Sequence, residues 1–197
     1  MQPYDPLDYG NLARSVVRAL LAGPEVTLPP SEPFEGAGAY AIYYRGDFAA
    51  YSPIARGKSA PPIYVGKAVP IGARKGSREA PGGRELFQRL SQHSNTVQQA
   101  KNLEPEDFTC RFLVVVPVWI TLAERFLVEH YKPIWNVVVE GFGNHDPGAG
   151  RRAMKRPCWD ILHPGRPWAS RLRSDESSDQ VLQRITDFLK QRPASFR

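Results

Sequence analysis

The chain has 197 residues, of which 42% are hydrophobic, enough to bury the core of one domain with an appended element. Its net charge of +6 and sequence pI of about 9.5 indicate a polyanionic partner. Cys110 and Cys158 lie far apart without metal-ligand spacing, which excludes a disulfide framework and a cysteine metal site. Because no signal peptide is visible and the longest apolar run, 112–120, is too short to span a bilayer, we expect a soluble cytoplasmic protein.

The N-terminal segment is expected to form a helix. Apolar residues recur at helical spacing over 6–22, and the Gly-Pro pair that follows ends the pattern. Residues 24–36 are rich in proline and predict an extended connector. This helix can pack on the core or reach a second subunit, and the sequence does not decide between the two.

Two short segments, 38–45 and 62–67, predict neighbouring strands of an antiparallel sheet. Both are rich in β-branched and aromatic residues and are bounded by glycine and proline. The first contains Tyr40, and the second contains Tyr64 and ends in a glycine followed by Lys67. Two phenols, a glycine and a lysine at strand ends form an unusual cluster, although each tyrosine taken alone is better read as an ordinary half-buried strand aromatic.

Long connections surround these strands. The segment 46–61 is too long for a tight hairpin and predicts an elaborated surface loop. The segment 68–83 is basic and rich in glycine, which suits either a loop that approaches a phosphate backbone or a solvated surface loop. Its candidate DNA-contacting residues are Arg74, Lys75 and Arg78.

A second helix is predicted over 84–100. Arg89 and His93 lie four residues apart and therefore share one side of it. An arginine and a histidine on one face can grip a phosphate and move a proton near neutral pH. The alternative is a solvated polar face.

A strand over 109–118 precedes a third helix over 121–131. The continuous apolar run of this strand predicts burial on both faces and a central position in the sheet. Early in the helix, Glu124 follows Thr121 at the spacing of a capping box. The functional alternative is that Glu124 binds magnesium, a hard cation that often takes only one or two protein carboxylates, with Glu129 as its nearest competitor.

The rest of the chain is basic and irregular until its end. Asn136 is read either as a brace for the site or as a turn residue. The Gly/Pro-rich segment 141–170 contains His145 and Asp146, whose context favours a turn over a metal or base pair, and 178–191 predicts a final helix. Further candidate DNA-contacting residues are Arg151, Arg152, Lys155 and Arg156.

These elements predict an α/β fold with a small central antiparallel sheet of three strands flanked by helices. We expect one domain over 1–197. It comprises an N-terminal helix and connector (1–35), a catalytic core with DNA-reading loops (36–140) and a basic C-terminal extension (141–197).

The order of motifs resembles the GIY-YIG nuclease superfamily. The first motif reads Gly38-Ala39-Tyr40 and the second Ile63-Tyr64-Val65-Gly66, each with one conservative departure from the superfamily's name. A helix with an arginine, a helix with an early glutamate and Pro-Ile-Trp-Asn follow in order, so the resemblance covers about 36–136. It implies the GIY-YIG fold and a nuclease activity.

A closer resemblance, carried by Arg89 with His93 and by the basic insertions, is to type II restriction endonucleases of this superfamily that cut CCGCGG as homodimers. It implies double-stranded DNA as substrate, magnesium at Glu124 and a cognate DNA methyltransferase as functional partner. The alternatives are a repair or homing nuclease of the superfamily and a basic DNA-binding protein without catalysis. The implied catalytic set is Tyr40, Tyr64, Arg89, His93, Glu124 and Asn136, with Lys67 as a further source of positive charge.

Each member of the set has an expected role. Tyr40 is the candidate base, with His93 relaying or accepting the proton. A free tyrosine titrates near ~10, so it needs nearby positive charge to act as a base. Arg89 contacts the phosphoryl group, Tyr64 orients water or phosphate, and Asn136 braces the site.

Overall fold

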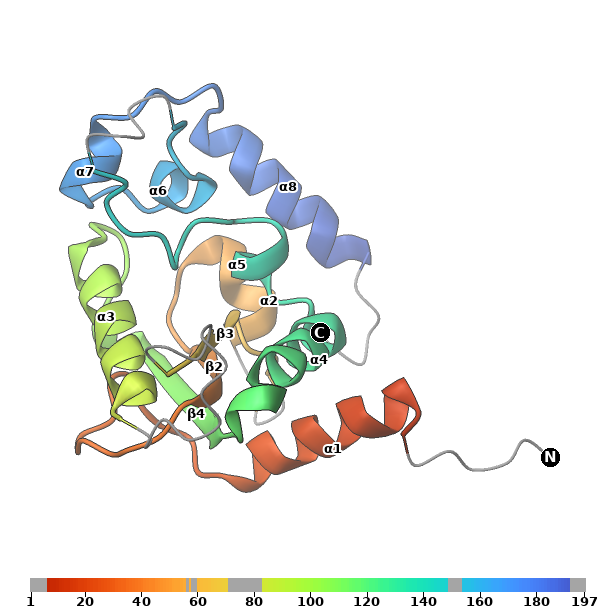
Figure 1. Cartoon of the computed structure of the whole chain (residues 1–197). Helices are drawn as coiled ribbons and strands as arrows, with labels where there is room; N and C mark the ends of the chain where they lie inside the picture. Colours follow the sequence, from red (N-terminus) through yellow and green to blue (C-terminus); the bar gives the residue numbers. More distant parts are fainter. Residues whose placement is uncertain (1–6, 56, 58–59, 71–82, 149–153, 192–197) are drawn as a thin grey trace.

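The computed structural model describes residues 7–55, 57, 60–70, 83–148 and 154–191 (Figure 1). Its longer helices are α1 (Tyr9–Ala22), α3 (Glu85–Gln99), α4 (Ile120–Tyr131) and α8 (Ser178–Gln191). Shorter helical segments are η1 (Ala49–Tyr51), α2 (Ser52–Ala55), η3 (Pro105–Asp107), η4 (Pro117–Trp119), α5 (Ile134–Val137), α6 (Cys158–Leu162) and α7 (Pro167–Ser170). Within these ranges, every helix is too short or too polar to cross a membrane.

The described residues form one antiparallel sheet of four strands in the order β1-β4-β2-β3. The strands are β1 (Val26–Thr27), β2 (Gly38–Tyr44), β3 (Tyr64–Ala68) and β4 (Phe108–Val114). The prediction of a mixed α/β fold with the two tyrosine-bearing strands paired antiparallel is confirmed. The predicted number of three strands is wrong, because two residues of the connector add β1 to the edge of β4.

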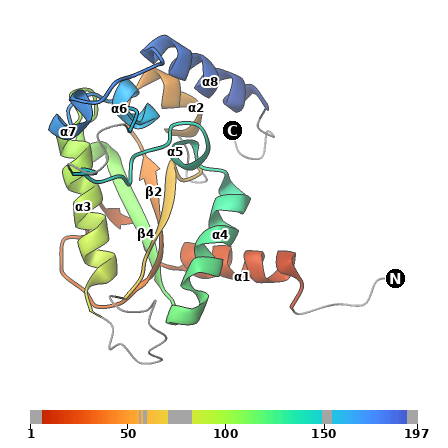
Figure 2. The ribbon, with the colours of Figure 1, turned by 45° about the horizontal axis from the view of Figure 1, so that its top comes forward.

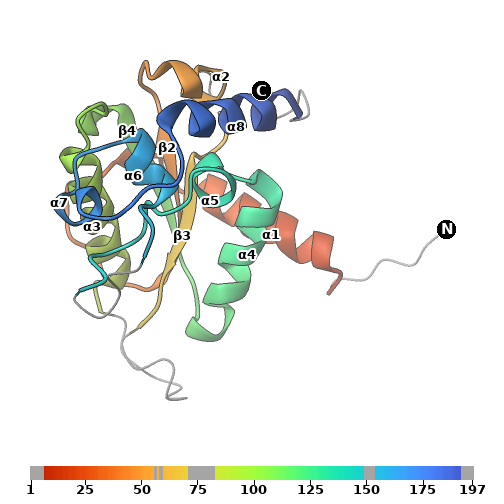
Figure 3. The ribbon, with the colours of Figure 1, turned by 90° about the horizontal axis from the view of Figure 1, so that it is seen from above.

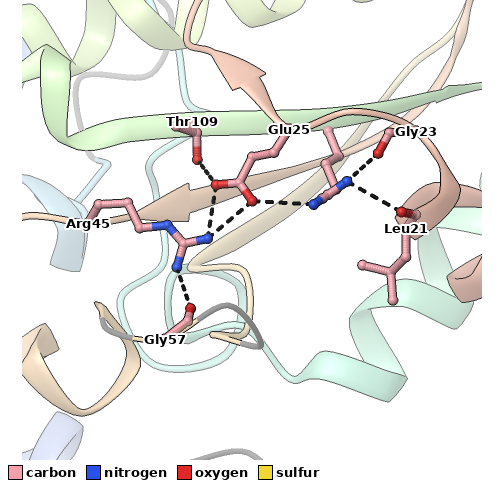
Figure 4. Close-up of polar contacts among 7 residues, drawn as sticks. Leu21, Gly23, Glu25, Arg45, Gly57 and Thr109 are labelled. Atoms are coloured by element: carbon pink, nitrogen blue, oxygen red, sulfur yellow. Dashed lines mark hydrogen bonds and ion pairs between the residues drawn. The ribbon is translucent and has the colours of Figure 1, made fainter.

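Polar contacts explain why the connector joins the sheet (Figure 4). Glu25 accepts hydrogen bonds from Arg45 at 2.9 Å and from Thr109, and Arg111 lies 3.5 Å away. Arg111 also donates to backbone carbonyls at the end of α1, including that of Gly23. Burial alone would raise the pKa of Glu25, but the hydrogen bonds from Thr109 and Arg45 and the two arginine charges lower it. The carboxylate therefore stays ionised and ties the connector to β4.

The sheet separates two apolar cores, and Figure 2 shows α3 on one side of it and α4 with α1 on the other. Along β2 the side chains alternate between the cores, as the two-residue period of a strand requires. Tyr40, Ile42 and Tyr44 face the larger core, whereas Ala41 and Tyr43 face the smaller one under α1 and α4. The predicted division of this strand into two faces is confirmed.

The C-terminal segment packs on the larger core. Trp159, Val181 and Ile185 are fully buried in it. Figure 1 places α6, α7 and α8 at one end of the molecule and α1 at the other, and Figure 3 shows α8 beside α2. The extension therefore adds a cover of helices to the side of the sheet that carries Tyr40.

Two predictions about burial are wrong. The strand predicted over 109–118 ends at Val114, before the 3-10 helix that begins at Pro117, and Val114 and Val116 are 56% and 65% exposed. The connection over 46–61 is not only a surface loop. It forms η1 and α2 and buries Tyr51 completely.

Candidate active site

A buried hydrogen bond joins Tyr40 of β2 to His93 of α3. The Tyr40 hydroxyl lies 2.6 Å from His93 Nε2, and the two residues are 0% and 1% exposed. Gly66 of β3 lies directly opposite Tyr40, where a Cβ would collide with the phenol ring and its hydroxyl. The glycine of the second motif is therefore required by the tyrosine of the first.

The environment fixes the protonation of this pair. Burial, followed by the charge of Arg89, lowers the pKa of His93 well below its usual value. Burial, with Tyr64 nearby, raises the pKa of Tyr40 well above its usual value. At neutral pH the imidazole is thus neutral and the phenol protonated. In the tautomer that carries its proton on Nδ1, His93 Nε2 accepts from the Tyr40 hydroxyl.

Aromatic rings enclose His93. Phe142 stacks on its imidazole at 4.6 Å between centroids, with 15° between the planes. Tyr64 meets it edge to face at 5.3 Å, and the rings of Tyr64 and Tyr40 lie 6.3 Å apart. The tyrosines of the two strand motifs therefore converge on one histidine, and Tyr64 is the partly exposed one.

Arg89, one helical turn before His93, lies at the exposed side of this cluster. Its guanidinium donates to the carbonyl of Gly143 at 3.0 Å, to Gln92 at 3.1 Å and to His145 Nε2 at 2.7 Å. Burial raises the pKa of the Tyr64 phenol, and the neighbouring Arg89 charge opposes that rise. The structure thus brings Arg89 and His93 to the two tyrosines, as the sequence predicted.

Glu124 faces the sheet from α4. Its carboxylate forms an ion pair with Lys67 of β3 at 2.7 Å, and both side chains are partly exposed. The capping-box alternative is wrong, because α4 starts after Trp119 without a side-chain cap. The competitor Glu129 lies elsewhere on the surface, bonded to Tyr9 and Arg125. Glu124 lies on the α4 side of the sheet, whereas Tyr40 and Tyr64 face the larger core on the α3 side. Its charge contributes to the raised pKa values of both phenols, so the carboxylate is within electrostatic reach of them across strand β3.

Asn136 clamps the strand that carries Tyr64. Its Oδ1 accepts from the backbone N–H of Val65 and its Nδ2 donates to the carbonyl of Val65, both at 2.8 Å. The backbone N–H of the neighbouring Trp135 donates to the carbonyl of Ile63 at 3.0 Å. These bonds pair backbone groups at the outer edge of β3, so Asn136 holds this strand and is not only a turn residue.

The donor set at Glu124 is compatible with magnesium. In the described part of the chain, no three His, Cys, Asp or Glu side chains gather as a metal cage. Magnesium commonly uses one or two carboxylates and completes its shell with water and substrate phosphate oxygens. A single partly exposed carboxylate fits that pattern, whereas zinc would require three or four protein ligands.

His145 is the contact that the sequence did not reveal. The turn predicted around it is confirmed, since Asp146 Oδ1 accepts from the N–H of Gly148 at 2.8 Å. The bond from Arg89 to His145, however, joins positions 56 residues apart. A histidine in a glycine-rich segment gives no local signal for such a distant partner.

The predicted DNA-contacting residues are only partly described. Lys155 pairs with Asp175 at 2.5 Å on the exposed surface. Arg156 donates to the carbonyls of Ala169, Ser170 and Leu172, which commits its guanidinium to holding the backbone. The other candidates, Arg74, Lys75, Arg78, Arg151 and Arg152, lie outside the described residues.

Comparison with protein families matches residues 32–189 to the family described as the Eco29kI GIY-YIG domain. Because the match covers most of the chain, the protein is a restriction endonuclease of the GIY-YIG class, and DNA is its substrate. Within this class the chain belongs to the Eco29kI GIY-YIG domain family. The match confirms the resemblance to the type II branch and extends beyond 136 into the C-terminal extension. Comparison with curated proteins found no match.

Proposed function

We propose that this protein hydrolyses both strands of double-stranded DNA at a short palindrome in a reaction assisted by magnesium. The observation that carries the proposal is the buried 2.6 Å hydrogen bond between Tyr40 and a neutral His93, under the charge of Arg89 and within electrostatic reach of Glu124. A buried phenol–imidazole pair can also be structural, as Tyr51 with His163 at 2.7 Å illustrates. The Tyr40–His93 pair differs because the charge of Arg89 acts on it and the partly exposed Tyr64 adjoins it.

The proton path follows from the protonation of this pair. A water attacks the phosphorus, and a new O–P bond forms as the bond to the leaving oxygen breaks. One proton of this water moves to the Tyr40 oxygen, and the leaving oxygen keeps its bonding electron pair and takes a proton from solvent. The Tyr40 proton passes to His93 Nε2, which becomes imidazolium. Tyr40 therefore never has to exist as a free phenolate, a state that its raised pKa disfavours. Tyr64, partly exposed beside the pair, orients the water.

Charge on the phosphate also helps His93 to take the proton. Arg89 is one of the groups that lower the pKa of His93. When a phosphoryl oxygen pairs with Arg89, the anion offsets that positive charge, so the affinity of His93 for a proton rises on substrate binding. Arg89 thereby stabilises the transition-state charge and prepares the acceptor.

Glu124 would hold the magnesium ion. When bound, the ion supplies positive charge to the phosphoryl and leaving oxygens. Lys67 lies 2.7 Å from Glu124 and partly neutralises the negative charge of this carboxylate when DNA and metal are absent. Its ammonium group would also be a second positive charge for the phosphate.

Cleavage of a palindrome calls for two copies of this site related by a two-fold axis. A candidate interface lies where α1 meets α4, in an apolar pocket of about 340 Å³ that is lined by Leu7, Trp119 and Leu122 among others. Leu7, Val118 and Trp119 are more than half exposed, and such patches on soluble proteins mark interaction surfaces. We propose a homodimer that uses this face.

Specificity would lie in the basic segments outside the catalytic cluster. Arginine pairs bidentately with the O6 and N7 atoms of guanine, so arginine-rich segments suit a G·C-rich site such as CCGCGG. The candidates are Arg74, Lys75, Arg78, Arg151 and Arg152. A restriction enzyme in a cell also requires a cognate methyltransferase that protects the same site.

Incubation of the protein with plasmid DNA and magnesium, followed by sequencing of the ends, tests this function. We expect discrete fragments whose ends all fall at one palindrome, and an intact plasmid when EDTA is present. A smear would indicate a nonspecific nuclease. An intact plasmid that is nevertheless retarded on a gel would indicate a binding protein without catalysis.

A further inference from the structure

A buried arginine of the C-terminal extension anchors the loop 141–145 from within. Arg166 is 2% exposed and donates to the carbonyls of Gly141 at 2.9 Å, Phe142 at 3.2 Å and Asn144 at 2.9 Å. Three backbone carbonyls within four residues accept from one planar guanidinium, which leaves this loop little freedom.

The same arginine is itself fixed. Asp160 of α6 binds it through both carboxylate oxygens, at 2.6 Å to Nε and 2.5 Å to Nη2. The guanidinium also lies 4.7 Å from the ring centroids of Trp159 and Trp168. Hydrogen bonds and an ion pair therefore connect Asp160 through Arg166 to the loop 141–145.

The other side of this loop meets the catalytic cluster. Phe142 stacks on His93, and the carbonyl of Gly143 and the Nε2 of His145 accept from Arg89. A Cβ at Gly143 would stand 2.9 Å from the Tyr64 hydroxyl and 3.1 Å from Arg89 Nη2. The loop is thus pressed against three of the predicted catalytic side chains.

We propose that His145 is a positioning residue that orients the Arg89 guanidinium for the scissile phosphate, on a loop held in place by the Asp160–Arg166 pair. This inference rests on the proposed hydrolysis of DNA. It gives the C-terminal extension a part in the reaction, because the extension supplies both the loop and its anchor.

Physical chemistry explains why Arg89 needs such a partner. A free arginine side chain samples many rotamers, and that freedom is lost when it settles on a phosphate. Donors that are already oriented stabilise transition-state charge without that reorganisation. His145 can accept from Arg89 only while its Nε2 is unprotonated. Burial and the charges of Arg89 and Arg166 lower the pKa of His145, which favours the neutral imidazole that this bond requires.

Two substitutions separate orientation from packing. His145→Ala removes the acceptor, whereas His145→Gln replaces Nε2 by an amide oxygen at similar reach. We expect His145→Ala to lower the single-turnover rate on the mapped DNA site by about ten- to a hundredfold, as misplaced catalytic groups do. The dissociation constant for the same duplex without metal should change less than about threefold, and His145→Gln should recover most of the rate. Asp146→Asn is the matched control. It keeps the side-chain oxygen that accepts from the N–H of Gly148, and it should cut like the wild type.

A double variant tests whether His145 acts through Arg89. If it does, Arg89→Ala with His145→Ala should cut no more slowly than Arg89→Ala alone. Three results would each overturn the inference and leave the proposed function intact. They are a wild-type cleavage rate for His145→Ala, a rate for His145→Gln as low as that of His145→Ala, and a double variant whose rate loss equals the product of the two single losses. A wild-type protein that leaves plasmid DNA uncut would overturn both.

Discussion

Tyr40 and Tyr43 offer a matched pair at the scale of single residues. They lie on the same strand and point to opposite faces, and only Tyr40 reaches a histidine. The Tyr43 hydroxyl is buried and has no hydrogen-bond partner in the described structure. Removal of the two hydroxyls should therefore have opposite consequences for activity and stability.

Tyr40→Phe should keep the fold and DNA binding but lower the cleavage rate by at least about a hundredfold, the usual effect of losing a positioned proton carrier. Tyr43→Phe should cut normally and be as stable as the wild type or slightly more stable, because it removes an unsatisfied buried hydroxyl. Single-turnover rates and urea denaturation check both variants. Near-normal turnover by Tyr40→Phe would end its role in the proton path.

Glu124 and Glu129 provide a second matched pair, both on α4. Glu124→Gln removes the charge that pairs with Lys67 and would hold magnesium, so cleavage should disappear while metal-free DNA binding persists. Glu129→Gln changes an exposed carboxylate bonded to Tyr9 and Arg125 and should leave cleavage unchanged. Titration of the cutting rate with magnesium measures both. Magnesium-dependent cutting by Glu124→Gln would remove Glu124 from the site.

At the scale of elements, the amide of Asn136 connects α5 to the edge of β3 through two bonds to Val65. A hydrogen bond contributes about 0.5–1.5 kcal/mol net, so Asn136→Ala should reduce the free energy of unfolding by about 1–3 kcal/mol. Because β3 carries Tyr64, the cleavage rate should fall as well. Urea denaturation measures the first effect. Val137→Ala, on the same helix and 45% exposed, is the control, and an equal loss in both variants would contradict the clamp.

Elements with strong local patterns could be predicted from the sequence. The alternation along β2, its pairing with β3 and the helical periods of α3, α4 and α8 are all local, and all were found. The edge strand β1 was missed, since two residues carry no pattern and the reason for their pairing is the contact of Glu25 with Arg45 and Arg111.

The candidate site also has a part that local sequence patterns predicted and a part that they did not. The spacing of Arg89 and His93 on one helix face indicated that they act together, and the two motifs indicated Tyr40 and Tyr64. The capping-box spacing at Glu124 was misleading, because the ion pair with Lys67 takes its carboxylate away from the helix start. The contact of Arg89 with His145 depends on a loop anchored by Arg166, so tertiary structure alone defines it.

At the scale of the whole molecule, buried neutral histidines should set the response of stability to acid. His163 is enclosed, with Nε2 2.7 Å from the Tyr51 hydroxyl and Nδ1 3.0 Å from Asn102 Oδ1. Burial lowers its pKa from 6.5 to about 3. Between these values the unfolded chain binds a proton that the folded chain does not, so this contribution is complete above pH 6.5 and is lost as the pH falls.

His163→Gln isolates that contribution. A single group of this kind changes the free energy of unfolding by about 1.4 kcal/mol per pH unit. Between pH 6 and pH 4, the wild type should lose stability more steeply than the variant by about that amount per unit. Urea denaturation at several pH values measures the two slopes. If the free energy of unfolding fell equally steeply with pH in both proteins, His163 would take up its proton in the folded protein over this pH range, and the prediction would be wrong.

The central claim is that Tyr40 and His93 form one path for the proton of the attacking water, and a double-variant cycle tests it most directly. His93→Gln keeps an acceptor for the Tyr40 hydroxyl but cannot take up a proton. If the two residues act as a unit, the single-turnover cleavage rate of Tyr40→Phe/His93→Gln should equal that of the slower single variant. The claim would be contradicted if the rate loss of the double variant equalled the product of the two single losses. It would also be contradicted if either single variant cut DNA at the wild-type rate.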